Sequence, residues 1–402
     1  MVKQLPSLAV HFYYFHKLIM IEYNLNMLQK LKKLLGHTYK PLNDVELNQF
    51  SLRDNFQYLS CINNYIKVAP VLKSNAYGHG INLIAKQLDI LNPPFFCVDS
   101  LYEGYKLLKL GIRTKILIMG YINPESLKTK KLPFSFAIYN YELLNAINKY
   151  QPHANIHIFI DTGMHREGLD IEELPEFLKY IKINTKLNVE GLMSHFAMAD
   201  KPKDKLTQRQ IKIFQKSQLI IQGLGMKPRW IHIANSSGLL NSKTLNGSLG
   251  NVARVGIALY GIDPEGKNNK LKPVLKLKSH ITQIKELRKG EKIGYDFAYR
   301  AQKNMKIAIL PIGYYDGVDR RLSNKGFVSI NNVATSIVGK VSMNLTIIDV
   351  SNIPNVKNGQ EVILYSDISS AKNSVGSAAK LCGTIPYDLL VHITSSTKRL
   401  LM

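Results

Sequence analysis

Short apolar stretches alternate with amphipathic helical patterns from about residue 66 to residue 261. This alternation predicts parallel strands with helices packed outside them. Eight such strands close into a TIM-type (β/α)8 barrel, so we predict an α/β fold. The predicted strands end near Lys73, Asp99, Gly120, Asn140, Asp161, His195, Asn235 and Gly261. The predicted helices are 50–66, 81–91, 101–110, 141–150, 171–183 and 205–223.

The pattern changes after a polar segment at 263–270. Short strands separated by turns follow, and one helix pattern at 375–381 interrupts them, which is typical of a mainly β domain. We therefore predict an N-terminal extension of uncertain role at 1–38, a barrel at 39–264 and a mainly β C-terminal domain at 265–402.

Residues 5–21 are largely apolar and aromatic, but two histidines and a lysine interrupt the run. No small-residue cleavage site follows, and the run is too broken for a membrane span. We expect a dispensable extension, with Met20 or Met27 as an alternative start, and no membrane span. A peripheral membrane anchor is the competing interpretation.

The chain carries a formal charge of +24, a balance that invites a nucleic-acid interpretation. The lysines are spread along all 402 residues without a long basic block or a nucleic-acid-binding motif, so we expect no nucleic-acid partner. The three cysteines, Cys61, Cys97 and Cys382, are far apart. Their spacing predicts reduced thiols in a cytoplasmic protein and no metal site.

A lysine follows the first predicted buried strand directly. Residues 66–72 are mostly apolar, Lys73 ends the run, and small and polar residues lead to a helix pattern near Ile81. The carboxyl ends of barrel strands are where such folds carry out chemistry, and a lysine amine partly withdrawn from water is a nucleophile and a base. Taken alone, Lys73 fits an ordinary surface lysine in a loop equally well.

Further motifs place Lys73 in a wider pattern. They are Lys73–Gly80 (KSNAYGHG), Asp161–Arg166 (DTGMHR), Ser194–Asp200 (SHFAMAD), His232–Ser236 (HIANS), Arg254–Gly261 (RVGIALYG), Gly294–Tyr295, Pro311–Tyr314 (PIGY), Ser342–Met343 and Ile385–Tyr387 (IPY). With these motifs in this order, the chain resembles alanine racemase from about Val45 to Arg399. This family uses pyridoxal 5'-phosphate (PLP) and has a barrel followed by a β domain. Each motif alone is weak, whereas the ordered set is specific.

The resemblance implies a role for each matching residue around the cofactor. Lys73 matches the lysine that forms an imine with PLP. Arg254 matches the residue facing the pyridine nitrogen, where a permanently charged donor disfavours a second proton, and His232 matches its orienting partner. Asn235 and Ser236 also fit a plain helix N-cap. The implied cofactor-binding set is Lys73, Tyr77, Asn235, Ser236, Arg254, Gly256, Ile257 and Tyr387.

Racemisation needs a proton acceptor on each face of a planar carbanion, so one lysine is insufficient. Tyr295 matches the family's second base, which serves the active site of the partner subunit. A phenol needs help from its surroundings to lose a proton near neutral pH, and His195 is the implied helper. The resemblance thus implies a homodimer with shared active sites.

The implied substrate is alanine, and the implied product is D-alanine for peptidoglycan in the cell wall. Arg166 matches the residue that binds the substrate carboxylate. Met343 matches a backbone contact to that carboxylate, and Tyr314 matches a tyrosine that narrows the mouth of the site.

Four residues depart from the family pattern. Phe159 stands where the family commonly has a carbamate-modified lysine, so Arg166 must be oriented otherwise, by an anion or by Glu167. Asn344 replaces a common aspartate, and His165 and Glu167 replace small and apolar residues. These changes leave substrate affinity, rate and strictness for alanine open.

Several other functions compete with this one. A broader amino-acid racemase would share the same motifs. A non-catalytic PLP carrier would lack the β domain and Tyr295, and a fold-related decarboxylase would carry a catalytic cysteine and a glycine-rich phosphate loop that we do not find. A nucleic-acid binder would be retained on DNA in a salt-sensitive way.

Overall fold

The computed structural model describes residues 40–128, 130–245 and 249–402. The predicted extension at 1–38 lies outside the described residues. Across the described ranges, none of the helices combines the length and the apolar character that crossing a membrane requires.

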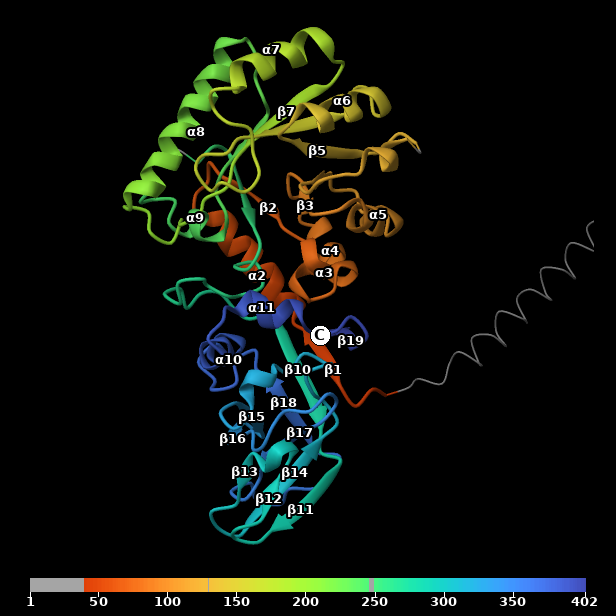
Figure 1. Ribbon diagram of the computed structural model, residues 1–402, viewed down its shortest axis with the longest axis vertical. Coiled ribbons are helices and arrows are strands. Elements are labelled where there is room, and N and C mark those ends of the chain that lie inside the picture. Colours follow the sequence, from red (N-terminus) through yellow and green to blue (C-terminus); the bar gives the residue numbers. More distant parts are fainter. Residues whose placement is uncertain (1–39, 129, 246–248) are drawn as a thin grey trace, which may run out of the picture. The chain divides into compact units, whose positions relative to one another are not determined.

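Parallel strands with helices outside them build the N-terminal part (Figure 1). Strands β3 to β8 form one six-stranded parallel sheet, and β2 pairs with β9 in parallel. A bridge between Val71 and Cys97 joins β2 to β3. On the other side, the N–H of Arg254 in β9 donates to the carbonyl of Ala234 just after β8 (2.9 Å), which joins β9 to β8. The predicted barrel is therefore confirmed. Its strands are β2 (Lys67–Pro70), β3 (Phe96–Val98), β4 (Ile116–Ile118), β5 (Phe134–Ile138), β6 (Asn155–Phe159), β7 (Asn188–Met193), β8 (Trp230–His232) and β9 (Val252–Val255).

Buried side chains from all eight strands, or from the residue next to a strand, pack together in one core cluster. Because alternate residues of a strand point to opposite faces, each strand supplies one face to this cluster and the other to the helices. The barrel is thus filled and offers a site only at its ends. The cluster contains Ala69, Val71, Phe95, Cys97, Leu117, Ala137, Phe159, Met193, Trp230 and Val252.

Five helices of the described barrel, α2, α5, α6, α8 and α9, begin at a capping side chain. Asn140 accepts the Leu143 N–H (2.8 Å), and Asp204 accepts the Leu206 N–H (2.8 Å). The helix predicted at 50–66 ends earlier, at Cys61, because Asn63 forms a turn by accepting the Tyr65 N–H. The helices are α2 (Gln49–Cys61), α3 (Lys73–Tyr77), α4 (Ile81–Asp89), α5 (Leu101–Lys109), α6 (Tyr141–Tyr150), α7 (Leu174–Asn184), α8 (Lys205–Gly223) and α9 (Ser236–Leu240), with a 3-10 turn (Pro124–Leu127) between β4 and β5.

The C-terminal part is mainly β, as predicted. It contains a six-stranded sheet in the order β16-β15-β18-β10-β1-β19, a three-stranded sheet in the order β11-β14-β17, and the pair β12-β13. Its elements are β10 (Leu275–His280), β11 (Gln283–Leu287), β12 (Lys292–Ile293), β13 (Tyr299–Arg300), β14 (Met305–Leu310), β15 (Phe327–Ile330), β16 (Val333–Ser336), β17 (Thr346–Asp349), β18 (Glu361–Tyr365), α10 (Val375–Cys382), α11 (Pro386–Val391) and β19 (Lys398–Leu401), with 3-10 turns at Tyr295–Phe297 and Arg320–Leu322.

One strand from before the barrel belongs to the C-terminal sheet. β1 (Asp44–Leu47) pairs antiparallel with β10 and parallel with β19. The domain boundaries at 39 and 265 stay a prediction. The place of β1 in this sheet was not foreseen, because its partners lie more than 200 residues away and leave no local pattern.

Candidate active site

A pocket of about 470 Å³ opens at the carboxyl ends of the barrel strands. Tyr387, from α11 of the C-terminal part, completes its lining. Every residue predicted to bind the cofactor lines this pocket, together with Arg166 and His195. These residues are Lys73, Tyr77, Asn235, Ser236, Arg254, Gly256, Ile257 and Tyr387.

The backbone after Lys73 makes a left-handed turn. Residues 74–77 have φ angles of 52–55°, a conformation that costs an L-residue roughly 1–2 kcal/mol. Local hydrogen bonds support the turn: the Ala76 N–H donates to the Leu72 carbonyl (2.8 Å), and the Gly80 N–H donates to the Asn75 carbonyl (2.8 Å). The regular helix begins only at Ile81. Such strain is typical of a functional site that the surrounding structure holds in place.

The C-terminal part clamps this turn. Arg399 of β19 donates from Nε and Nη2 to the Gly78 carbonyl (3.2 and 2.9 Å) and from Nη1 to the Thr397 carbonyl (2.6 Å). Gly78 itself has φ 79°, and a Cβ there would lie 2.0 Å from the Leu390 carbonyl oxygen of α11. The lysine-bearing turn is therefore held against a helix that lies about 310 residues later in the chain.

Hydrogen-bond donors gather at one end of the pocket. The Ser236 hydroxyl accepts the N–H groups of Gly256 (3.2 Å) and Ala258 (3.3 Å). A Cβ on Gly256 would lie 2.3 Å from the Tyr77 hydroxyl, so only glycine leaves room for that phenol. Burial raises the pKa of Tyr77, and it raises the pKa of Tyr387 to about 12, so both hydroxyls keep their protons at neutral pH.

Asn235 caps a helix, which is the alternative role that the sequence left open. Its side chain accepts the Gly238 N–H (2.9 Å) and caps α9. It still lines the pocket, but its side-chain oxygen is engaged in this cap.

Arg254 is buried and donates to two histidines. Its Nη1 contacts His232 Nδ1 (2.6 Å), and its Nη2 contacts His195 Nδ1 (2.9 Å) and the Ser194 carbonyl (2.5 Å). Burial lowers the pKa of Arg254 to about 10, which leaves it charged at neutral pH. Because a guanidinium can only donate, both Nδ1 atoms must accept, and each ring carries its proton on Nε2. Burial, and then the charge of Arg254, lowers the pKa of His195 to about 3 and that of His232 well below its usual value.

The hydrogen bonds continue from His232 through the barrel interior. His232 Nε2 lies 2.8 Å from His157 Nδ1, and His157 Nε2 lies 3.6 Å from the carboxylate of Glu190. Glu190 also accepts from Ser135 (2.8 Å) and Lys115 (3.1 Å). Burial opposes its ionisation, but these hydrogen bonds outweigh burial and lower the pKa of Glu190 to about 2. We did not predict His157 and Glu190; the available signal was a histidine and a carboxylate within apolar strands.

Arg166 lies in a braced loop after β6. The Asp161 carboxylate accepts the N–H groups of Gly163 (2.8 Å), Met164 (2.9 Å) and His165 (3.0 Å). Arg166 is half-exposed, and its Nε lies 3.9 Å from the Glu167 carboxylate. Phe159, 5% exposed, lines the same pocket.

The remaining predicted residues lie outside this pocket, on the C-terminal part. Tyr295, Tyr314 and Met343 are 67%, 43% and 56% exposed. Their loops adjoin one another: the Tyr314 N–H donates to the Ser342 carbonyl (3.0 Å), and Asp296 pairs with Lys340. A single chain thus forms two groups, one around Lys73 and one around Tyr295. The prediction that the second group serves a neighbouring subunit stays a prediction.

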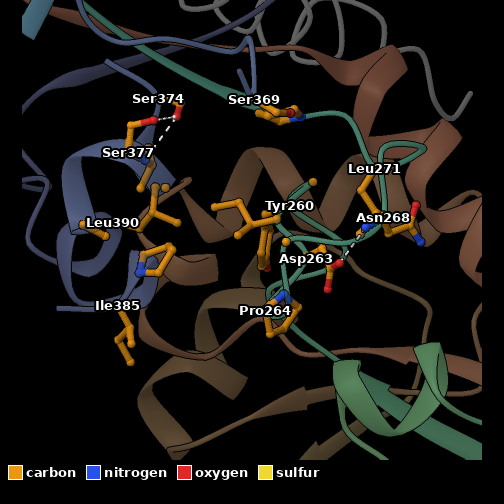
Figure 2. Close-up of a pocket in the computed structure, with 18 of the residues that line it drawn as sticks. Tyr260, Asp263, Pro264, Asn268, Leu271, Ser369, Ser374, Ser377, Ile385 and Leu390 are labelled. Atoms are coloured by element: carbon orange, nitrogen blue, oxygen red, sulfur yellow. Dashed lines mark hydrogen bonds between the residues drawn. The ribbon is translucent and has the colours of Figure 1, made fainter. Parts of the chain in front are cut away.

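A second, larger pocket of about 770 Å³ lies between the 260–271 segment and α10 (Figure 2). It shares only Ile385 with the first pocket and holds none of the other residues predicted to act in catalysis or binding. Figure 2 shows Ser374 hydrogen-bonded to Ser377 (2.9 Å) and the Asn268 N–H donating to Asp263 (2.7 Å). These polar groups brace their own loops, so we place the candidate active site in the first pocket.

Comparisons with known proteins cover both parts of the chain. Residues 47–264 match the family "Alanine racemase, N-terminal domain", and residues 274–401 match "Alanine racemase, C-terminal domain". Alanine racemase of Citrifermentans bemidjiense is 34% identical over 88% of this chain and 97% of the relative. That of Syntrophobacter fumaroxidans is 33% identical over 81% of this chain and 88% of the relative.

Solved structures agree with this. Alanine racemase of Clostridium difficile 630 superposes with a TM-score of 0.83 at 29% identity, covering 91% of this chain and 97% of that one. Alanine racemase of Bacillus anthracis, solved with bound L-Ala-P, gives a TM-score of 0.82 at 28% identity, covering 90% and 96%. The chain belongs to the alanine racemase family and is an amino-acid racemase.

Proposed function

We propose that this enzyme interconverts L-alanine and D-alanine with PLP as its cofactor and with Lys73 and Tyr295 as its two bases. One observation carries the proposal. A lysine amine, a cluster of hydroxyl and N–H donors and a buried arginine line one pocket at the barrel mouth.

This donor set fits PLP. The aldehyde of PLP needs a primary amine, which Lys73 offers. Its phosphate needs uncharged donors, which Tyr77, Ser236 and Tyr387 offer with backbone N–H groups nearby. The space that Gly256 leaves beside the Tyr77 hydroxyl belongs to the same cradle. Arg254 would meet the pyridine nitrogen.

When bound, PLP supplies an electron sink for the charge left on the α-carbon when its proton departs. Lys73 would take or return that proton on one face, and Tyr295 would do so on the other. Arg254 stays charged at neutral pH and can only donate, so it would disfavour a proton on the pyridine nitrogen. The cofactor would then be a weaker electron sink, which would suit proton exchange and suppress side reactions.

His195 supports the second base through its tautomer. Its Nδ1 accepts from Arg254 (2.9 Å), so its Nε2–H remains to donate. A donor at that atom would stabilise the phenolate form of Tyr295. The low pKa of His195, about 3, keeps the ring neutral, so it positions the phenol without adding a further charge.

We further propose a cytoplasmic homodimer that supplies D-alanine for peptidoglycan, without nucleic-acid partners. The exposed group of Tyr295, Tyr314 and Met343, lying outside the Lys73 pocket, supports shared active sites. Arg166 and Met343 would bind the substrate carboxylate, and Tyr314 would favour small side chains. His232 would position Arg254.

Exchange of the α-proton of L- and D-alanine in D2O, followed by NMR, tests the two bases. Lys73→Ala should lose both exchange reactions and the visible absorbance of the lysine-bound cofactor. Tyr295→Phe should keep the absorbance and slow exchange of L-alanine by about 10²-fold or more. Tyr102→Phe, whose phenol is exposed to the same extent (68% against 67%), should behave as wild type.

Full activity of Tyr295→Phe with both enantiomers would show that the second base is misassigned. Rates with serine, lysine and arginine in the same assay decide between an alanine racemase and the broader racemase.

A further inference from the structure

Charged side chains of both signs line the active-site pocket, and two of its three carboxylates have a cation other than Arg166 nearby. Lys73, Arg166 and Arg254 line it together with three carboxylates, Asp99, Glu167 and Asp388. Asp99 lies 3.8 Å from Lys73, and Asp388 is bound by Arg321 (2.8 Å). Among the described residues, Glu167 is the carboxylate that lies within ion-pair distance of Arg166.

Arg166 shares its electrostatic environment with the other cations. Burial and Arg254 are the main causes that lower the pKa of His195, and Arg166 adds to them. Arg166 also contributes, after burial, to the lowered pKa of Arg254. A half-exposed guanidinium beside like charges is driven toward solvent unless an anion holds it. Phe159, which lines the same pocket, cannot supply that anion.

Glu167 lies where it can hold Arg166 without blocking it. Its Oε2 is 3.9 Å from Nε of Arg166, on the inner edge of the guanidinium. The two terminal nitrogens form the other edge, which suits a second, bidentate carboxylate.

The loop keeps the two side chains in place. The Asp161 carboxylate accepts three backbone N–H groups of residues 163–165. Gly168, with φ 135°, packs so closely that an added Cβ would lie 2.3 Å from the backbone nitrogen of Asp161. Glu167 also adds, after burial, to the raised pKa of Tyr139, whose ring meets Phe159 edge-on at 6.4 Å. The carboxylate thus acts near the barrel strand that carries Phe159.

We propose that Glu167 is a positioning residue, which holds the guanidinium of Arg166 by its Nε edge and leaves the terminal nitrogens to bind the substrate carboxylate. This inference rests on the proposed function, because it requires Arg166 to meet that carboxylate. It states what orients Arg166 in this chain, where Phe159 stands at the position of the family's modified lysine.

The test compares Glu167→Gln, Glu167→Asp and Glu172→Gln in the holoenzyme. Propionate, which is alanine without its amino group, is titrated calorimetrically, and KM and kcat are measured with L-alanine. Glu167→Gln should raise the propionate Kd and KM by up to about five-fold and leave kcat within about two-fold. Glu167→Asp should recover part of the loss, and the exposed control Glu172→Gln should change nothing.

A double-mutant cycle separates orientation from general charge. In an Arg166→Gln background, Glu167→Gln should have no further effect on the propionate Kd. An additive effect, a lower Kd in Glu167→Gln, or equality with Glu172→Gln would each overturn the inference. Failure of the proposed function looks different, because wild type itself would then lack alanine exchange.

Discussion

At the residue scale, a group that can only donate hydrogen bonds sets the protonation of its neighbours in the candidate active site. Arg254 donates to His195 and His232, and this fixes both rings as neutral acceptors at Nδ1. The donors proposed to bind the phosphate are neutral, since Tyr77 and Tyr387 keep their protons at neutral pH. The two histidines and the two tyrosines thus stay neutral around the charged Arg254.

Gly256→Ala tests the cradle at this scale. The added Cβ would lie 2.3 Å from the Tyr77 hydroxyl and 2.6 Å from its ring, so the phenol must move. Overpacking of this kind costs about 1–3 kcal/mol, and we expect PLP affinity to fall about ten-fold or more.

Gly223→Ala is the matched control, because a Cβ there meets nothing within 4 Å. Equilibrium titration of the apo-protein with PLP measures both variants. An unchanged affinity in Gly256→Ala would mean that Tyr77 does not bind the phosphate.

At the element scale, neighbouring strands carry side chains that act on one another. β5, β6, β7 and β8 contribute Ser135, His157, Glu190 and His232 to a single series of polar contacts that ends at Arg254; the His157–Glu190 contact is 3.6 Å, and the others are hydrogen bonds. Because parallel strands keep a fixed register, a carboxylate on one strand can set the tautomer of a ring on the next. The barrel interior therefore supports the arginine as well as the fold.

Glu190→Ala should destabilise the protein. It leaves the buried His157 Nε2–H and the Ser135 hydroxyl without their acceptor, which costs about 2–3 kcal/mol. Urea denaturation measures the loss, and ¹⁵N NMR of the imidazoles should show His232 still protonated on Nε2, because Arg254 continues to donate to its Nδ1.

Glu286→Ala is the control, since its pair with Lys306 is exposed and should contribute below about 1 kcal/mol. A loss of stability in Glu190→Ala no larger than that in Glu286→Ala would show that the buried contacts of Glu190 do not stabilise the fold.

At the scale of the whole molecule, three buried histidines and the partly buried His195 make the free energy of unfolding depend on pH. Burial lowers the pKa of His79 to about 4 and that of His195 to about 3, and it also lowers the pKa of His157 and His232. Each ring binds a proton in the unfolded state at a pH where the folded state does not. Their contribution to the free energy of unfolding is therefore complete above about pH 6.5. It is lost as the pH falls toward the pKa values of these rings in the folded state.

We expect the free energy of unfolding to fall between pH 6.5 and pH 5, by up to about 1.4 kcal/mol per pH unit for each histidine. Urea titrations at several pH values, with and without PLP, measure this slope. His153→Asn should leave the slope unchanged, because His153 is exposed and its φ of 65° suits asparagine. A flat profile would mean that these rings are not held neutral.

Much of the fold was predictable from local patterns. The helix predicted at 205–223 is α8 to the residue, and those at 81–91 and 141–150 match α4 and α6 closely, since their apolar spacing and caps are local properties. The left-handed turn after Lys73 was not predictable, because its residues have no common preference for positive φ. It persists because Arg399 and α11 hold it from the far end of the chain.

The sequence by itself determined the order of strands and helices and the residues around the candidate cofactor, because periodicity and short motifs depend on near neighbours. Only the tertiary structure decided that β1 joins the C-terminal sheet, that Glu190 contacts the histidine pair that ends at Arg254, and that Arg399 holds the turn after Lys73. Those relations depend on distances and hydrogen-bond partners in space, which the spacing of residues along a chain does not specify.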